Sequence, residues 1–266
     1  MYGGARLDNL LLMETGLIIS LLLYFLYGGV PGYASVPTTG PYAVGFRETT
    51  ITKELYNDCS VFYPVDKEVA NKFERDSNGF AYLLRYPDSI AGMIRSLRWQ
   101  DGLPKGVQQT RTKFMTFISV PVAFDAPLAS DFAQGKKKLQ PVLWSHAEAA
   151  DRMMYSGMLR ELASYGFVVI ALNHNDQTCM HTLGSLKEEQ EGELQPKIMG
   201  NSKSPLIEES PECAAREVIK FDSKKSVENI EYTQLQLQIR EAEIDHLITE
   251  VSHNNLISKI FGLTKK

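Results

Sequence analysis

The segment that decides the fold of this 266-residue chain is 139–176, with the sequence LQPVLWSHAEAADRMMYSGMLRELASYGFVVIALNHND. It holds two short apolar runs, at 141–144 and 167–172. Continuous runs of this length are typical of strands that are buried on both faces. Between the runs, apolar residues recur at helical spacing before the stop signal Gly166, and these residues are Met154, Met158, Leu159 and Leu162. The segment therefore predicts a strand near 142–145, a helix near 152–164 and a second strand near 167–172.

Polar residues follow both predicted strands at the point where each strand ends. Ser145 and His146 follow the first strand, and residues 173–176, Asn-His-Asn-Asp, follow the second. A strand-helix-strand unit forms a right-handed parallel crossover, in which ligand-binding groups lie beyond the carboxyl ends of the strands. We therefore expect the functional side chains of this unit at that edge of the sheet.

The same segment resembles the platelet-activating-factor acetylhydrolase family, also called the lipoprotein-associated phospholipase A2 family. That family has a strand, Ser-His-Gly, a helix that ends in Leu-Ala-Ser-x-Gly-Phe, a second strand and His-x-Asp. The matching positions are Ser145, His146, Tyr155, Ser156, Leu162, Ala163, Ser164, Gly166, Phe167, His174 and Asp176. Residues 40–45 are similar to the family's Gly-Pro-aromatic-x-Val-Gly, and residues 61–64 to its strand that ends in Tyr-Pro. The resemblance spans roughly residues 40 to 250.

This resemblance implies an α/β fold, as part of an α/β-hydrolase with a mostly parallel sheet. It implies hydrolysis of the short or oxidised sn-2 acyl ester of a phospholipid such as platelet-activating factor. The implied route is a serine acyl-enzyme that needs no calcium and no other cofactor. A phospholipid or a lipid surface is the partner that it implies.

The serine of an α/β-hydrolase lies on a sharp turn of sequence Gly-x-Ser-x-Gly, because small neighbours permit the strained backbone. The nearest match is 200–204, Gly-Asn-Ser-Lys-Ser, which lacks the second glycine. In the resembled family this elbow, the acid and the histidine lie downstream of the long helix. We therefore expect a sheet truncated before the elbow, no catalytic triad, and a chain that is inactive alone. The alternative is a non-catalytic hydrolase remnant that binds lipid or is attached to a membrane.

The resemblance also suggests a role for the loop after the first strand of the unit. The family's Ser-His-Gly-x-Gly corresponds to residues 145–149, so Glu148 takes the position whose backbone N–H helps to bind the oxyanion. Alanine replaces glycine at Ala147 and Ala149. Alanine lacks the φ freedom of glycine, so the loop departs from the family pattern at both positions.

Two histidines end the strands of the unit. We find no nucleophile next to His146 or His174 in the sequence, so we predict a structural hydrogen-bond network of Ser145, His146, His174 and Asp176. Imidazole and thiolate groups suit zinc, and four neighbouring residues offer such groups or a carboxylate: His174, Asp176, Cys179 and His181. Their spacing matches no zinc pattern, and we expect no metal.

Composition bounds the class of protein. The chain has 28 basic and 32 acidic residues, a net charge of −4, so charge provides no case for nucleic acid as a partner. With 44% hydrophobic residues it can bury one sizeable core. Its three cysteines, Cys59, Cys179 and Cys213, predict no disulfide framework.

We divide the chain into a hydrophobic amino-terminal segment, 1–34, a linker, 35–40, and the hydrolase part, 41–266. The most apolar stretch, 10–30, is interrupted by Glu14. It fits a cleaved signal peptide, an uncleaved anchor or a soluble helix, and the first two place the chain in the secretory pathway.

The rest of the chain contributes weaker signals. We predict an antiparallel hairpin from strands near 42–46 and 59–63, a partly helical apolar insert over 67–138, and a polar excursion over 177–213. A helix is predicted near 226–252. Its apolar residues repeat every seven positions, and they are Ile230, Leu237, Ile244 and Val251. Val227, Leu247 and Ile248 widen this stripe. This stripe predicts packing on the sheet, with a coiled-coil seam as the alternative. A truncated sheet would leave an open strand edge, so we also expect the isolated chain to be poorly soluble.

Overall fold

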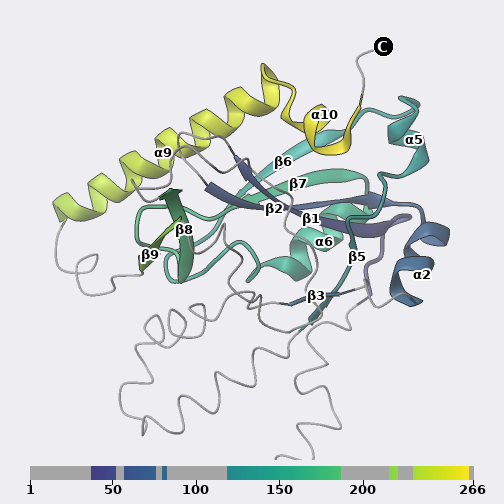
Figure 1. The fold of residues 1–266 in the computed structure, drawn as a ribbon, viewed down its shortest axis with the longest axis horizontal. Coiled ribbons are helices and arrows are strands. Elements are labelled where there is room, and N and C mark those ends of the chain that lie inside the picture. The colour runs from purple at the N-terminus through teal and green to yellow at the C-terminus, as the bar shows by residue number, and fades with distance from the viewer. Residues whose placement is uncertain are drawn as a thin grey trace, which may run out of the picture.

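The computed structural model describes residues 37–51, 57–75, 80–82, 119–186, 216–220 and 230–263. Its centre is a five-stranded mixed sheet with the order β5-β1-β2-β7-β6 (Figure 1). The strands are β1 (Ala43–Ile51), β2 (Asn57–Val65), β5 (Ala123–Phe124), β6 (Gln140–Ser145) and β7 (Phe167–Leu172). The β1/β5 and β6/β7 pairs are parallel, and the β1/β2 and β2/β7 pairs are antiparallel. The predicted hairpin of β1 and β2 is therefore confirmed.

Helices cover both faces of this sheet, as the α/β prediction requires. They are α2 (Lys67–Arg75), α5 (Ser130–Ala133), α6 (Ser156–Ser164), α9 (Ile230–Ser252) and α10 (Leu256–Phe261). One apolar cluster packs α6 against the sheet, and the other joins the opposite face to α2, α5, α9 and α10 (Figure 1). Two small antiparallel sheets of two strands each complete the described fold: β3 (Phe80–Tyr82) with β4 (Ser119–Pro121), and β8 (His181–Leu186) with β9 (Arg216–Lys220).

The predicted strand-helix-strand unit is formed by β6, α6 and β7. The parallel register pairs Gln140 with Phe167 and Ser145 with Leu172, so both strands end side by side. Helix α6 stops where expected, because Gly166 adopts φ +103° and donates its N–H to the Ala163 carbonyl at 2.9 Å. The carboxyl ends of β6 and β7 therefore meet at one edge.

The expectation that both strands of this unit are buried on both faces is wrong for β6. Its residues are exposed or half-buried, whereas β7 is almost fully buried. The reason is position, because β7 lies between β2 and β6, and β6 is an outer strand of the described sheet.

Two glycines of the amino-terminal motif mark close contacts between segments. A Cβ on Gly40 would lie 2.2 Å from the carbonyl oxygen of Ser164, at the end of α6. A Cβ on Gly45 would lie 2.3 Å from the ring of Tyr63. Real side chains do not approach so closely, so these two positions require glycine. The motif thus docks β1 on β2 and on the end of α6.

The predicted packing of the long helix on the sheet is confirmed, but the predicted face is wrong in its amino-terminal half. Leu247 is buried and Val251 packs against the same apolar cluster. Ile230 and Leu237, however, are 78% and 60% exposed. The other buried residues of α9 are Gln236, Glu243 and Glu250. Gln236 donates to the Asp176 carbonyl at 3.0 Å, and Glu243 accepts hydrogen bonds beyond the end of β7. Since buried polar groups need such partners, these contacts orient the helix.

Other sequence expectations are met in part or lie outside the described residues. Residues 181–186, in the predicted polar excursion, form β8, because they pair with β9. The apolar stretch 10–30 and Ser202 lie outside the described residues. Within the described ranges, the structure contains no helix with the length and apolarity needed to cross a membrane.

Candidate functional site

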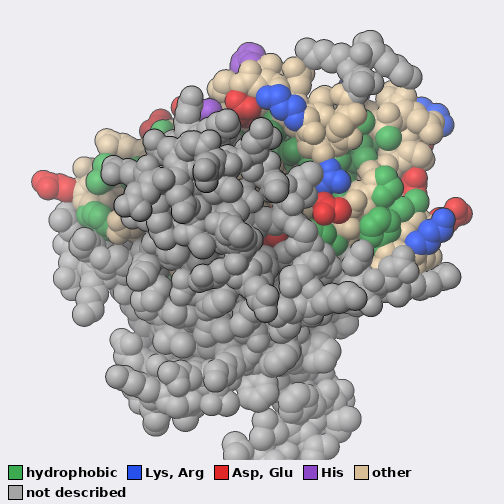
Figure 2. All heavy atoms as spheres, in the orientation of Figure 1, with side chains coloured by type: hydrophobic (Ala, Val, Ile, Leu, Met, Phe, Trp, Pro, Cys, Tyr) green, Lys and Arg blue, Asp and Glu red, His purple; other side chains and the backbone are tan. Residues whose placement is uncertain are grey.

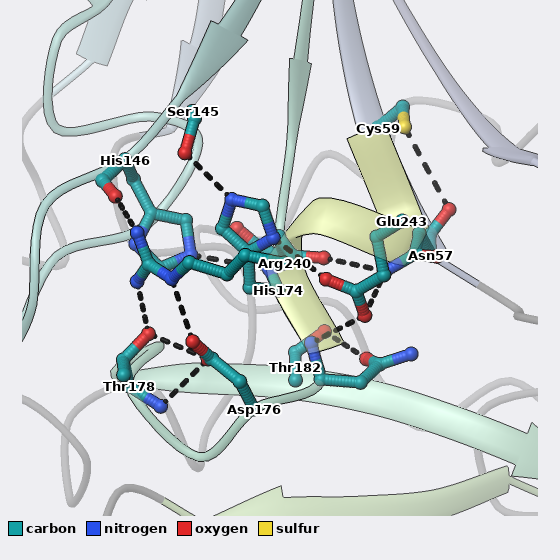
Figure 3. A network of polar contacts seen from close by, with 12 residues as sticks. Asn57, Cys59, Ser145, His146, His174, Asp176, Thr178, Thr182, Arg240 and Glu243 are labelled. Atoms are coloured by element: carbon teal, nitrogen blue, oxygen red, sulfur yellow. Dashed lines mark hydrogen bonds and ion pairs between the residues drawn. The ribbon is translucent and has the colours of Figure 1, made fainter. Parts of the chain in front are cut away.

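A polar network lies where β6 and β7 end, and α9 closes it from one side (Figure 3). The Oγ of Ser145, the last residue of β6, lies 2.7 Å from Nε2 of His174. Nδ1 of the same ring lies 2.6 Å from Oε2 of Glu243, on α9. His174 and Glu243 are buried, and Ser145 is exposed. A hydroxyl, an imidazole and a carboxylate are thus joined in that order.

Further hydrogen bonds hold the carboxylate of Glu243 in place. Its Oε1 accepts from the side-chain amide of Asn57 at 2.8 Å and from the backbone N–H of Asn175 at 2.9 Å. The Asn57 amide also donates to the Asn173 carbonyl at 3.0 Å. Donors of this kind fix the orientation of a carboxylate. Helix α9 is therefore tied to the amino end of β2 and to the loop after β7.

The second histidine of the network is neutral. His146 Nδ1 donates to the Ala147 carbonyl at 2.8 Å, and its Nε2 accepts the backbone N–H of His174 at 3.1 Å. A proton on Nε2 would break the second bond. Burial lowers the pKa of His146 from 6.5 to about 3, and the nearby His174 and Arg240 act in the same direction.

This burial predicts a loss of stability in mild acid. Below about pH 6.5 the unfolded chain protonates His146, whereas the native chain does not until about pH 3. The unfolded state then binds more protons, so the free energy of unfolding falls by about 1.4 kcal/mol per pH unit in this window. We expect a loss of about 2 kcal/mol from pH 7 to pH 5, measured by urea unfolding.

The pH effect is assigned by comparing variants. His146→Gln should flatten the dependence between pH 7 and pH 5, because the titrating ring is gone. His253→Gln, a change at an exposed histidine near the end of α9, should keep the slope of the unmodified chain. Equal slopes for all three proteins would show that His146 titrates normally in the native state.

An ion pair links α9 to the loop after β7. Arg240 Nε lies 2.6 Å from Asp176 Oδ2, and its Nη1 donates to the His146 carbonyl at 2.8 Å. Asp176 also accepts the backbone N–H of Thr178 at 3.0 Å and its hydroxyl at 2.6 Å. Arg240 and Glu243, three residues apart on α9, therefore hold the loops that follow β6 and β7.

The loop expected to bind an oxyanion is anchored to the same region. Ala149 adopts φ +61°, the left-handed conformation that favours glycine, and its N–H donates to the Thr178 carbonyl at 2.9 Å. The family pattern has glycine at this position because glycine adopts a positive φ without steric strain. Ala149 keeps the same backbone conformation at a cost in conformational energy. Glu148 lies exposed in this turn. The oxyanion role of its backbone N–H stays a prediction.

The structure brings Ser145, His146, His174 and Asp176 into one network. The sequence did not predict a hydroxyl beside either histidine, but the structure places that of Ser145 beside His174. The parallel register of β6 and β7 explains this contact, because Ser145 pairs with Leu172, which lies two residues before His174.

The sequence analysis also missed the partners on other elements. Asn57, Arg240 and Glu243 bind the network, but they lie far from it in the sequence. Arg240 and Glu243 lie three residues apart, so they share one side of the helix, but only the structure shows that this side is the buried one.

Two of the residues considered for a zinc site have other partners in the structure. Both ring nitrogens of His174 are engaged by Ser145 and Glu243, and Asp176 is paired with Arg240. Among the described residues, no group of three His, Cys, Asp or Glu side chains is arranged to hold a metal ion.

Comparison with known proteins assigns this chain to a protein family. The sequence model of the family described as platelet-activating factor acetylhydrolase, isoform II, matches residues 28–263. The chain belongs to this family. A platelet-activating factor acetylhydrolase of Cavia porcellus is 27% identical over 157 residues, which cover 57% of this chain and 31% of that protein. The match therefore spans about a third of the acetylhydrolase from Cavia porcellus.

Proposed function

We propose that this protein acts in the hydrolysis of the short or oxidised sn-2 acyl ester of a phospholipid such as platelet-activating factor. The observation that carries this proposal is the acetylhydrolase family match over 28–263. The match spans the whole five-stranded sheet, the loop after β6 and helix α9. An acyl-enzyme route that uses no calcium is the chemistry we propose with it.

The loop after β6 supports a specific part in this reaction. A developing oxyanion is stabilised by backbone N–H groups that are already held in place. The bond from Ala149 to Thr178 and the bond from the Met180 N–H to the Ala150 carbonyl, at 2.9 and 3.0 Å, hold this loop. We propose that the Glu148 N–H is the oxyanion donor.

We also propose that residues 1–266 alone do not hydrolyse platelet-activating factor. No Gly-x-Ser-x-Gly motif occurs in these residues. An alkoxide of glycerol is a poor leaving group, so its ester needs a nucleophile, an oxyanion hole and an acid together. Acetate release from acetyl-labelled platelet-activating factor, measured in EDTA, should match the rate without protein. Acetate release faster than the rate without protein would contradict this expectation if Ser145→Ala or Ser202→Ala abolishes it.

The phospholipid partner is proposed on family grounds and on surface character. On the face drawn in Figure 2, the described side chains mix hydrophobic, basic and acidic types. The net charge of −4 gives no electrostatic case for a polyanion such as nucleic acid. A location in the secretory pathway, which rests on the apolar stretch 10–30, belongs to the same proposal.

A second candidate function is non-catalytic binding to a lipid surface. The observation that favours it is a set of exposed apolar side chains on α9, which are Ile230, Leu235, Leu237 and Ile248. Flotation with phosphatidylcholine vesicles would test it, using the full chain and a chain that starts at Ser35. Flotation of the full chain alone assigns lipid binding to the amino-terminal segment, equal flotation assigns it to the rest, and no flotation excludes this function.

A further inference from the structure

We propose that Ser145 is itself a nucleophile, activated by His174 and Glu243, that reacts with activated acyl esters and phosphonates. This proposal goes beyond the family reaction, because it uses no Gly-x-Ser-x-Gly elbow. All three residues lie in the described part of the chain. The sites of nucleophilic hydrolases are recognised by this geometry rather than by sequence order.

The ring of His174 presents the correct atom to each neighbour. Its Nδ1 lies 2.6 Å from the carboxylate of Glu243, and its Nε2 lies 2.7 Å from the hydroxyl of Ser145. A carboxylate only accepts hydrogen bonds, so the ring proton belongs on Nδ1. The lone pair of Nε2 then accepts the proton of the serine hydroxyl, which is the arrangement of a general base.

A nucleophilic serine must be accessible to the reagent, whereas its base and carboxylate are best kept from water. His174 is fully buried, Glu243 is 3% exposed, and Ser145 is exposed at the end of β6. A reagent can therefore reach the hydroxyl, while the base and the carboxylate lie away from water. Weak screening in such an environment strengthens the attraction between Glu243 and the imidazolium that forms.

The base and the carboxylate are fixed before any reagent binds. Glu243 is held by the Asn57 amide and the Asn175 N–H, and the backbone of His174 donates to His146 (Figure 3). A nucleophile and a base held in reacting geometry need little reorganisation. A purely structural serine would need a hydrogen-bond partner, but not this order of three groups.

The reaction balances with these groups and water. The Ser145 oxygen bonds to the acyl carbon, its proton moves to Nε2 of His174, and the bond to the leaving group breaks. With p-nitrophenyl acetate the products are acetyl-Ser145 and p-nitrophenolate, and the proton passes to the solvent. Water then attacks the acyl carbon and gives one proton to His174, which passes it to the departing Ser145 oxygen. The acetic acid that is released loses the other proton of the water to the solvent.

This route accounts for a restricted substrate class. Phenolate and fluoride leave without help from an acid, so an activated serine suffices. The sn-2 ester of a phospholipid releases an alkoxide, so it also needs an acid that protonates the leaving oxygen. Reactivity with activated esters is thus compatible with the proposed absence of platelet-activating factor hydrolysis by residues 1–266.

The test is labelling of the full chain with a fluorophosphonate. The expected result is one phosphonyl adduct, mapped to the peptide that contains Ser145, and a rate about a hundredfold or more above that of the urea-unfolded chain. Ser145→Ala should lose the adduct. Ser130→Ala, at another exposed serine, and Ser202→Ala, in the Gly200 to Ser204 half-match, should label like the unmodified chain. Folding of each variant is checked by its thermal unfolding transition.

The roles of the partners have separate readouts. His174→Gln and Glu243→Gln should each slow labelling and p-nitrophenyl acetate turnover by about a hundredfold. Glu243 acts as a positioning residue, so proton NMR should also show a low-field Nδ1–H resonance that persists in Ser145→Ala and is lost in Glu243→Gln. A folded chain without an adduct on Ser145, or with the adduct on Ser202, overturns the proposal.

The outcome is independent of the family reaction. Platelet-activating factor hydrolysis that survives Ser145→Ala would contradict the proposed inactivity of residues 1–266 and leave the labelling result standing. Labelling of Ser145 without any hydrolysis of platelet-activating factor supports both proposals.

Discussion

Replacing Arg152 by methionine is expected to lower the free energy of unfolding by about 3–5 kcal/mol. Arg152 Nη2 lies 2.8 Å from Glu48 Oε1 of β1, and Nη1 lies 3.7 Å from Asp58 Oδ2 of β2. Its Nε donates to the Ser60 hydroxyl at 2.9 Å. All of these side chains are buried. The variant removes the cation from between two buried carboxylates, and this costs more than the pair itself contributes.

Urea unfolding at pH 7 measures this loss. Lys137→Met is the matched control, because Lys137 lies 2.9 Å from Asp131 in an exposed ion pair, and exposed pairs contribute little. The control should unfold at nearly the urea concentration of the unmodified chain. Glu48→Gln combined with Arg152→Met should recover part of the loss, because it removes one buried charge. A loss below about 1 kcal/mol for Arg152→Met would show that water reaches these carboxylates.

The second large effect is expected on α9, where two leucines differ in burial. Leu247 is 1% exposed and belongs to the apolar cluster on the α9 face of the sheet. Leu247→Ala should lower the free energy of unfolding by about 2–5 kcal/mol, because the deletion leaves a cavity. Leu237 is 60% exposed, so Leu237→Ala should change it by less than about 0.5 kcal/mol.

The pair is a test of the orientation of α9. The same chemical change on one helix is compared by urea unfolding, and the exposed substitution serves as the control for helix propensity. If the seven-residue stripe faced the sheet, Leu237→Ala would be the more damaging change. A larger loss for Leu237→Ala than for Leu247→Ala would therefore contradict the orientation described above.

Local patterns account for the elements that the sequence predicted well. The continuous apolar run at 167–172 and the stop at Gly166 are local signals, and both appear as expected in β7 and α6. The start of α6 was predicted too early, near residue 152. Asp151 explains this, because its Oδ1 accepts the N–H groups of Met153 and Met154 at 2.9 and 3.0 Å and holds a turn before Ser156.

Patterns that depend on distant neighbours were less well predicted. The apolar run 141–144 resembles a buried strand, but its burial depends on what lies beside β6. The polar excursion was predicted from its composition, and yet residues 181–186 pair with β9, thirty or more residues further along the chain. Pairing over such distances leaves no periodic signal in a single sequence.

The sequence by itself determined the strand-helix-strand unit, its polar strand ends and the family, because these depend on short-range periodicity and local motifs. It also identified Ser145, His146, His174 and Asp176 as one group at these ends. Only the tertiary structure decided which side chains of the group are in contact. The register of β6 on β7 brings Ser145 to His174, and α9 adds Glu243. The physical reason is that buried charged groups must be paired. Glu243 and Arg240 therefore turn the polar side of α9 inward and leave Ile230 and Leu237 in solvent.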